Sequence, residues 1–397
     1  MFLIDQPYVS DFLIKTIKDN NYKIVSTKIA KTLVSDETLN WVSEKDAIEF
    51  IEQNPNFPIY INSENALPWI GKNLKYSRHT KQLPLLKNKA KFRDLIKNTF
   101  PDFFYKTVEL KDIPELSLDG IGFPFVIKPS LGFFSIGVHI IRNLEEWQAA
   151  KKELNVKKLQ SIFPKEVLDT SIFIIEEYIE GEEFAVDCYF NNLGEVVILN
   201  ILHHKFSSGT DISDRVYSTS KNIVYKNKNN IEDFLNPIGK KIGLKNFPAH
   251  VELRIDAKGQ IRPIEINPLR FGGWCTTGDL SWYAFGINSY EYFIDNKKPD
   301  WENIFKTEND KKYSIIVLDN NSGIKPSEIS GFNYVLLNND LENALVIRKL
   351  NIKEYPVFGF VFAETSKNND EELDNILVSD LRKYIITNRR YLNHRNY

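Results

Sequence analysis

Residues 249–274 read AHVELRIDAKGQIRPIEINPLRFGGW. The alternation of apolar and polar positions on each side of the Lys258-Gly259 turn predicts a β-hairpin with strands over 249–256 and 261–266. Glu265 and Asn267 are two residues apart, so their side chains share one face of the sheet, and Glu252 can lie on that same face. The alternative is a pair of solvent-facing strands with ordinary acids. The apolar residues at the intervening positions indicate instead a sheet that is covered on its other face.

The three polar side chains of this hairpin make an oxygen-only donor set. Carboxylate and amide oxygens are the ligands that Mg²⁺ takes, usually together with water and phosphate oxygens. Two carboxylates brought close together are also costly without a cation. We therefore predict a metal site formed by Glu252, Glu265 and Asn267.

A polar segment with two glycines follows the hairpin directly. The guanidinium of Arg270 is a planar fork suited to carboxylate or phosphate, and Gly272 and Gly273 allow the backbone to approach a ligand closely. The alternative for Arg270 is a loop arginine paired with an acid. Trp274 either lines an acceptor pocket or only packs, and His203, at the end of an earlier predicted hairpin, either orients a substrate or is structural.

A lysine ends the apolar strand predicted over 123–128. Lys128 would bury its stem and direct its ammonium into a cleft, although a lysine at a sheet edge can also extend to solvent. The loop over 130–138 contains two glycines and two serines, Ser135 among them, and precedes a strand predicted over 137–141. Backbone N–H groups of such a loop can cover phosphate oxygens, and the preceding lysine strengthens this interpretation.

An acidic strand end follows at residues 176–183. A solvated run of charge is one interpretation. The other is an extended segment between two lobes that offers backbone groups to an adenine edge, with Glu183 four residues past Ile179 in reach of the ribose hydroxyls. The segment consists of Glu176, Glu177, Tyr178 and Ile179.

Composition restricts the class of protein. The chain has 397 residues, of which 42% are hydrophobic and 13% aromatic, so it can bury a sizeable core. The net charge of −2 gives no basic excess for nucleic acid, and no apolar run is long enough to span a membrane. The N-terminus lacks the basic region of a signal peptide, and Cys188 and Cys275 form neither a disulfide framework nor a zinc motif. We expect a cytoplasmic protein.

The apolar periodicity predicts an α/β chain in four parts. Residues 1–88 alternate strands and helices, which favours a small parallel, Rossmann-like sheet, although its first turn lacks the glycine of a phosphate loop. Residues 89–180 and 181–300 are the expected small nucleotide lobe and large catalytic lobe, and 301–397 an α/β extension. Expected helices cover 89–100, 145–154, 231–242, 279–295 and 371–386.

The order of these residues resembles the ATP-grasp superfamily, over about residues 89–295. Family ligases place one lysine on a helix, here Lys89 with Lys91 as its rival, and one on the strand before the loop, here Lys128. The spacing in 176–183 is similar to that of D-alanine–D-alanine ligases, and 270–274 looks like the corresponding segment of bacilysin-type L-amino-acid ligases. In many relatives the arginine lies two residues after the asparagine, whereas Arg270 lies three after it.

The resemblance implies an ATP-grasp fold, ATP with Mg²⁺ or Mn²⁺, and an ADP-forming carboxylate–amine ligase. Lys128 and Arg270 would be the catalytic side chains, and the small-molecule carboxylate and amine would include an amino acid. It also implies a homodimer. Two alternatives are a carboxylase-type or acyl-phosphate-forming enzyme and a nucleotide-binding regulatory protein without turnover.

Overall fold

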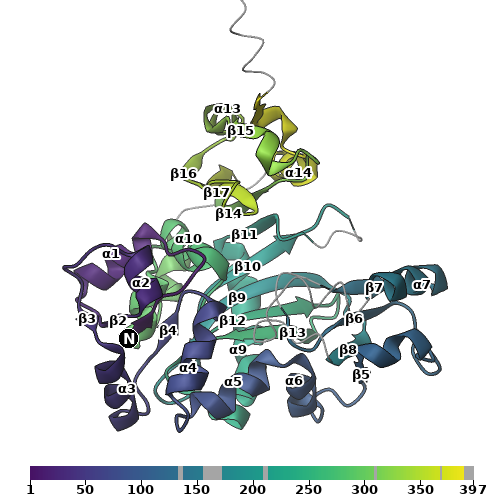
Figure 1. Cartoon of the computed structure of the whole chain (residues 1–397), viewed down its shortest axis with the longest axis horizontal. Coiled ribbons are helices and arrows are strands. Elements are labelled where there is room, and N and C mark those ends of the chain that lie inside the picture. Colours follow the sequence, from purple (N-terminus) through teal and green to yellow (C-terminus); the bar gives the residue numbers. More distant parts are fainter. Residues whose placement is uncertain (133–136, 155–171, 209–212, 308–310, 367–368, 389–397) are drawn as a thin grey trace, which may run out of the picture.

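A computed structural model of the chain describes residues 1–132, 137–154, 172–208, 213–307, 311–366 and 369–388. Figure 1 shows a large central sheet with an N-terminal lobe on one side and a small lobe carrying α7 on the other. At the top of Figure 1 the C-terminal part of the chain continues the central sheet, and helices α4, α5 and α6 run beneath the sheet. The mixed α/β class predicted from the sequence is thus visible as an arrangement in space.

The N-terminal lobe is a parallel four-stranded sheet in the order β3-β2-β1-β4. Its alternation of strands and helices confirms the predicted parallel sheet, and it adds α2 and β3, which the prediction lacked. Ser43 accepts a hydrogen bond from the backbone N–H of Asp46 and so caps α3. The elements are β1 (Phe2–Leu3), α1 (Asp11–Asp19), β2 (Ile24–Val25), α2 (Lys28–Leu33), β3 (Trp41–Val42), α3 (Glu44–Gln53) and β4 (Tyr60–Ile61).

Four short helical segments connect this lobe to the next. They are η1 (Glu64–Ala66), α4 (Leu67–Asn73), α5 (His79–Lys87) and α6 (Lys89–Ile96). The side chain of Asn88 caps α6 by accepting from the N–H of Lys91. The cap fixes Lys89 at the first position of the helix, and α6 ends four residues earlier than expected.

The small lobe is an antiparallel sheet in the order β5-β8-β6-β7. Phe125, Trp147 and Phe173 are buried in its core. The predicted strands and helix are confirmed here, and β5 is a strand that the sequence prediction missed. The elements are β5 (Tyr105–Glu109), η2 (Leu110–Glu115), β6 (Phe125–Pro129), β7 (His139–Ile141), α7 (Leu144–Glu153) and β8 (Ile172–Glu177).

The central sheet has eight strands in the order β13-β12-β9-β10-β11-β14-β17-β16. α9 (Lys221–Ile242) packs Ile231, Leu235 and Ile238 against Val186 and Val251 on one face of it. That cover leaves the other face of β9, β12 and β13 for polar side chains, as the alternation in the hairpin predicted. The strands are β9 (Glu182–Phe190), β10 (Val196–Lys205), β11 (Val216–Thr219), β12 (Phe247–Ile255), β13 (Ile261–Pro268), β14 (Lys311–Asp319), β16 (Ala344–Lys349) and β17 (Val357–Ser366).

Two helix predictions in the C-terminal half were wrong. The helix expected over 279–295 is divided by Gly286, whose φ of 69° ends α10 in a left-handed cap. The helix expected over 371–386 ends at Val378, because Ser379 is extended and the chain turns into a short strand. The elements are η3 (Gly273–Cys275), α10 (Thr276–Phe285), α11 (Ser289–Ile294), α12 (Trp301–Lys306), η4 (Pro326–Glu328), β15 (Ile329–Phe332), α13 (Tyr334–Asn339), α14 (Asp370–Val378), η5 (Arg382–Tyr384) and β18 (Ile385–Thr387).

The central sheet continues across the boundary expected at residue 300. β14 pairs with β11 and with β17, so the C-terminal strands extend the same sheet that carries the hairpin. The four domain boundaries remain predictions. Among the helices described, none combines the length and apolarity needed to cross a membrane.

Close packing between α9 and the sheet predicts the effect of one substitution. A Cβ added at Gly239 would lie 2.1 Å from Cε1 of Phe190, a fully buried ring. We expect Gly239→Ala to lower the free energy of unfolding by about 1–3 kcal/mol, as overpacking does, measured by chemical denaturation. Gly71→Ala in α4 is the control: a Cβ there meets nothing within 4 Å, and we expect unchanged or slightly raised stability. Equal effects of the two substitutions would contradict this reading of the packing.

Candidate functional site

The open face of β9, β12 and β13 gathers the polar side chains predicted from the hairpin. Glu252 pairs in register with Glu265, thirteen residues later, and His250 pairs with Asn267. On the neighbouring strand, Glu252 lies beside Ala185. Side chains at paired positions project from the same face, so the three predicted metal ligands lie together.

Hydrogen bonds connect these three side chains. Nδ2 of Asn267 lies 3.0 Å from Oε1 of Glu265 and 3.4 Å from Oε1 of Glu252. Nζ of Lys89 lies 2.7 Å from Oε2 of Glu265, which brings α6 onto the hairpin. Lys91 is exposed on the same helix, so the geometry distinguishes the two rival lysines in favour of Lys89.

The two carboxylates are in unequal electrostatic environments. Desolvation and then the negative charge of Glu265 hold the pKa of Glu252 well above its usual range. Desolvation also acts to raise the pKa of Glu265, but the ammonium of Lys89 outweighs it and the pKa is lowered. A cation placed beside Glu252 would therefore stabilise its ionised form.

The donor set fits a hard divalent cation. In the described part of the chain, no group of three or more His, Cys, Asp or Glu side chains is arranged to hold a metal ion. The predicted set is of a different composition, two carboxylates and one amide, and oxygen donors of this kind suit Mg²⁺ when water and phosphate complete the shell. An amide can present either its NH₂ or its oxygen by rotating, so Asn267 is compatible with both roles.

A histidine that the sequence analysis did not select stands behind Glu252. Nδ1 of His250 lies 2.7 Å from Oδ1 of Asp187, and the N–H of Gly272 donates to the same oxygen at 3.1 Å. Nε2 of His250 is 3.8 Å from Oε1 of Glu252. Its position two residues before Glu252 puts it on the same face by strand alternation, which is the signal that could have identified it.

Lys128 lies in the small lobe with its ammonium buried. Its Nζ is 2.5 Å from Oε1 of Glu176, and Nε of Arg93 donates to the other oxygen of that carboxylate at 2.8 Å. Burial would raise the pKa of Glu176, but the charges of Arg93 and Lys128 lower it to about 2. The structure thus brings the two predicted residues together through a direct ion pair, with Arg93 as a partner that the sequence analysis missed.

The segment after Glu176 is held by an arginine of β12. Nη1 of Arg254 donates to the carbonyl of Ile179 at 2.6 Å, and its guanidinium lies 5.0 Å from the centroid of the Tyr178 ring. Glu177 accepts a 3.4 Å hydrogen bond from the N–H of Phe104. The segment connects β8 of the small lobe with β9 of the large lobe, as expected of a link between lobes.

The carboxylate of Glu183 is held by Arg254 and His204. Its Oε2 accepts from Nε of Arg254 at 3.0 Å, and its Oε1 lies 2.9 Å from Nδ1 of His204. Desolvation opposes the ionised form, yet these partners lower the pKa of Glu183. The carboxylate faces the same side of the sheet as Glu252, because Arg254 pairs in register with Glu183.

Arg270 contacts an acid of the N-terminal lobe. Nη2 donates to Oε1 of Glu64 at 2.8 Å, and Lys87 pairs with the other oxygen of that carboxylate. The alternative considered from the sequence, an arginine paired with an acid, is therefore present in the structure. Burial acts to lower the pKa of Arg270, but the charges of Glu64, and then of Glu252 and Glu265, outweigh it and raise the pKa. The charge of Arg270 therefore acts on the carboxylate cluster.

The two predicted substrate residues have different surroundings. His203 pairs in register with Phe184, and so projects to the opposite face of the sheet from His204 and Glu252. The centroid of the Trp274 ring lies 5.4 Å from that of Tyr355 and 6.1 Å from that of Tyr8. The backbone φ of Trp274 is 58°. The structure thus separates His203 from the other candidates and places Trp274 between N-terminal and C-terminal aromatic rings.

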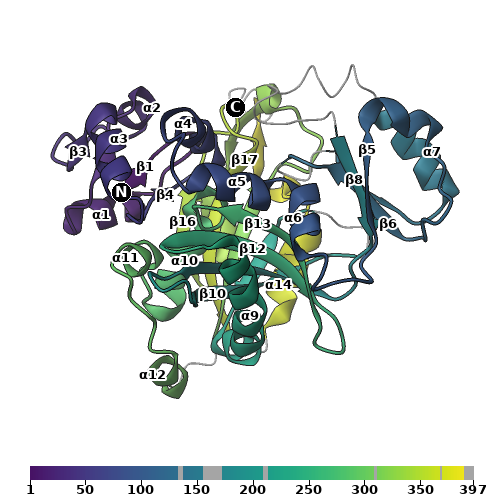
Figure 2. The same cartoon turned by 90° about the horizontal axis from the view of Figure 1, so that it is seen from below.

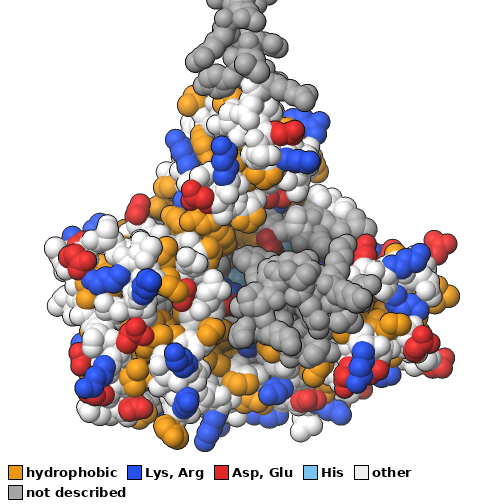
Figure 3. Space-filling view, in the orientation of Figure 1, with side chains coloured by type: hydrophobic (Ala, Val, Ile, Leu, Met, Phe, Trp, Pro, Cys, Tyr) orange, Lys and Arg blue, Asp and Glu red, His pale blue; other side chains and the backbone are white. Residues whose placement is uncertain are grey.

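Ser135, predicted as a phosphate contact, lies outside the described residues, as do residues 133, 134 and 136 of its loop. Figure 3 shows apolar side chains where the C-terminal strands meet the body of the molecule.

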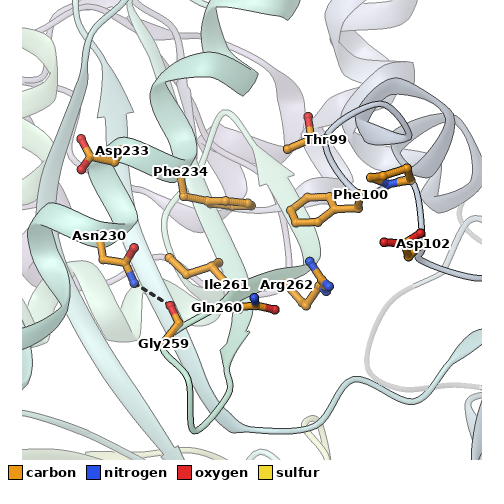
Figure 4. Close-up of a pocket in the computed structure, with 11 residues that line it drawn as sticks. Thr99, Phe100, Asp102, Asn230, Asp233, Phe234, Gly259, Gln260, Ile261 and Arg262 are labelled. Carbon is orange, nitrogen blue, oxygen red and sulfur yellow. Dashed lines mark hydrogen bonds between the residues drawn. The ribbon is translucent and has the colours of Figure 1, made fainter.

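A separate surface groove lies away from all of these residues. It has a volume of about 460 Å³ and lies between the chain after α6, α9 and the turn from β12 to β13. Figure 4 shows Phe100 and Phe234 facing each other there, with Arg262 beside Phe100 and Asn230 hydrogen-bonded to the carbonyl of Gly259. Since none of the predicted site residues lines it, the groove is distinct from the candidate site.

Comparison with known proteins identifies the domain. The ATP-grasp domain family model matches residues 121–278. An alanine–anticapsin ligase of Bacillus amyloliquefaciens is 25% identical over 193 residues, which are 45% of this chain and 39% of the relative. D-alanine–D-alanine ligase A of Bacillus cereus is 33% identical over 103 residues, 26% of this chain and 29% of the relative. The matches thus span well under two thirds of these relatives' length.

A solved structure extends the likeness to nearly the whole chain. The L-amino acid ligase from Bacillus licheniformis superposes with a TM-score of 0.67 and 18% sequence identity, and covers 97% of this chain and 98% of that one. At this level of identity the likeness concerns the fold. The chain therefore has the ATP-grasp fold, and its residues 121–278 match the ATP-grasp domain family.

Proposed function

We propose that this chain is an ATP-dependent carboxylate–amine ligase that forms an amide bond through an acyl phosphate and releases ADP. The observation that carries the proposal is the joining of Glu252, Glu265 and Asn267 on one sheet face, with Lys89 and the charge of Arg270 acting on them. An oxygen-donor cluster beside several cations suits a nucleotide triphosphate with its metal ion.

Glu252, Glu265 and Asn267 would hold Mg²⁺ or Mn²⁺. The ion supplies charge neutralisation to the phosphates when bound. The orientation of the cluster comes from the protein, because Lys89 fixes Glu265 and His250 stands between Asp187 and Glu252.

The remaining candidates would bind the nucleotide and the reacting groups. Lys89 and Lys128 would contact phosphates together with Ser135, the extended segment from Glu176 to Ile179 the adenine, and Glu183 the ribose. The substrate carboxylate attacks the γ-phosphorus, ADP leaves, and the amine then attacks the acyl carbon and displaces phosphate. Arg270 would stabilise the developing negative charge.

The substrates are small molecules, and at least one of them is an amino acid. Support comes from the printed names of the relatives, which are ligases of alanine or D-alanine, and from the fold of an L-amino acid ligase. Trp274, between Tyr8 and Tyr355, would border the amino-acid site. A substrate-orienting role for His203 has little support, because its side chain projects to the other face of the sheet.

The reaction can be tested directly on the purified chain. With ATP and Mg²⁺ and all pairs of amino acids, we expect phosphate release together with a product whose mass is that of the two substrates less one water. Phosphate release would be measured colorimetrically and the product by mass spectrometry. Release that requires bicarbonate and no amine would instead indicate a carboxylase-type enzyme, and no ADP across the panel would indicate nucleotide binding without turnover.

Substitution of Arg270 separates chemistry from nucleotide binding. We expect Arg270→Ala to lower the rate of product formation about 100-fold or more, since a donor to developing charge is lost. The affinity for ATP should be largely retained, because Glu64 keeps Lys87 as its partner. Steady-state kinetics and nucleotide titration measure the two effects, with Arg270→Lys as the charge-retaining control. Weakened ATP binding with normal turnover at saturation would contradict the role given to Arg270.

Substitution of Lys89 tests the cation site without an activity assay. Lys89→Met removes the ammonium that neutralises Glu265, and we expect a loss of roughly 2 kcal/mol in the free energy of unfolding, as for a hydrogen bond to a charged group. Millimolar Mg²⁺ should raise the melting temperature of this variant more than that of the wild type, because the ion replaces the lost charge. The exposed Lys91→Met is the matched control and should behave as the wild type. Equal Mg²⁺ shifts in the three proteins would count against the site.

A further inference from the structure

One buried arginine joins the two lobes on either side of the proposed nucleotide site. Arg93 lies on α6, one helical turn after Lys89, so the two cations share a face of that helix. Figure 2 shows α6 between β13 of the central sheet and β8 of the small lobe. Nη1 of Arg93 donates to the carbonyl of Pro263 at 2.7 Å, and its Nε to Oε2 of Glu176 at 2.8 Å.

The carboxylate of Glu176 is held by two cations at once. Arg93 takes one oxygen and Lys128 the other, and the side chains of Arg93 and Glu176 are 3% and 2% exposed. A buried carboxylate that loses its counter-charge is strongly destabilised. With Lys128 as its sole partner, Glu176 would keep that ammonium from any other ligand.

Arg93 alone can compensate the charge of Glu176. Its Nη2 is buried and makes no hydrogen bond with any other described residue, so a donor is available beyond the two in use. The guanidinium is also held 4.6 Å from the centroid of the Phe103 ring, which restricts its movement. An arginine fixed in this way can neutralise the carboxylate while the more flexible lysine changes partner.

We infer that Arg93 is a positioning residue of the nucleotide site: it keeps Glu176 neutralised and in place, so that the ammonium of Lys128 can move from Glu176 to a phosphate oxygen of the nucleotide. This role rests on the proposed function, because it requires a nucleotide beside Lys128. It also ties the small lobe to the metal-site hairpin, since Pro263 precedes Glu265 by two residues on β13.

Calorimetric titration of the full chain with MgADP, without amino acids, tests the role. We expect Arg93→Gln to weaken MgADP binding ~tenfold or more, because Lys128 is then retained by Glu176. The double variant Arg93→Gln/Glu176→Gln should bind more tightly than Arg93→Gln, because the competing carboxylate is gone. Arg93→Lys, which keeps the charge, should stay within ~threefold of the wild type.

Arg262→Gln is the matched control. The guanidinium of Arg262 lies 4.8 Å from the centroid of the Phe100 ring, and Phe100 belongs to the same connecting segment as Phe103. Arg262, however, lines the surface groove shown in Figure 4. We expect its MgADP affinity to equal that of the wild type. Thermal unfolding of every variant separates loss of binding from loss of fold. If Arg93→Gln does not fold, the double variant and Arg93→Lys remain, and both are expected to bind MgADP.

The outcomes distinguish this role from the proposed function. A wild-type chain that binds no MgADP overturns the proposed function. Wild-type binding with an unaltered Arg93→Gln variant overturns only the role of Arg93. A folded double variant that binds no more tightly than Arg93→Gln overturns it as well, because a purely structural contact gives no reason for recovery.

Discussion

Charge compensation of carboxylates at the joint between the lobes is the constraint on which the rest of the site depends. Glu64, Glu176, Glu183 and Glu265 each lie against a cation that belongs to another helix or strand than the carboxylate itself. Buried carboxylates are tolerated only when they are paired. The lobes are therefore joined by the same ion pairs that shape the candidate site, and Glu252, whose pKa is raised, is where further positive charge is needed.

The fold supplies this arrangement through two simple devices. Strand alternation in β12 and β13 directs apolar residues to α9 and polar residues to the open face. Helix periodicity in α6 then presents Lys89 to the hairpin and Arg93 to the small lobe from one short helix. The site thus lies at a joint between lobes rather than within one, which is where ligand sites are commonly found.

The sequence predicted the parts of this protein that depend on local patterns. The hairpin, the shared face of Glu265 and Asn267 and the N-terminal parallel sheet follow from periodicity and turn chemistry. The same patterns failed at the end of α14, where the acidic start of a helix was visible but its stop at Ser379 was not. β3 has only two residues and so shows no period, and in β5 only Val108 is buried, so its apolar signal is weak.

The amino-acid sequence by itself determined which residues could face one another within the hairpin and which elements alternate. Only the tertiary structure decided the partners: Glu64 for Arg270, Glu176 for Lys128, Arg254 for Glu183, and the opposite face for His203. The physical reason is that periodicity constrains residues within a few positions of each other. An ion pair between residues 83 or 206 positions apart is fixed by how the lobes pack, which no local pattern encodes.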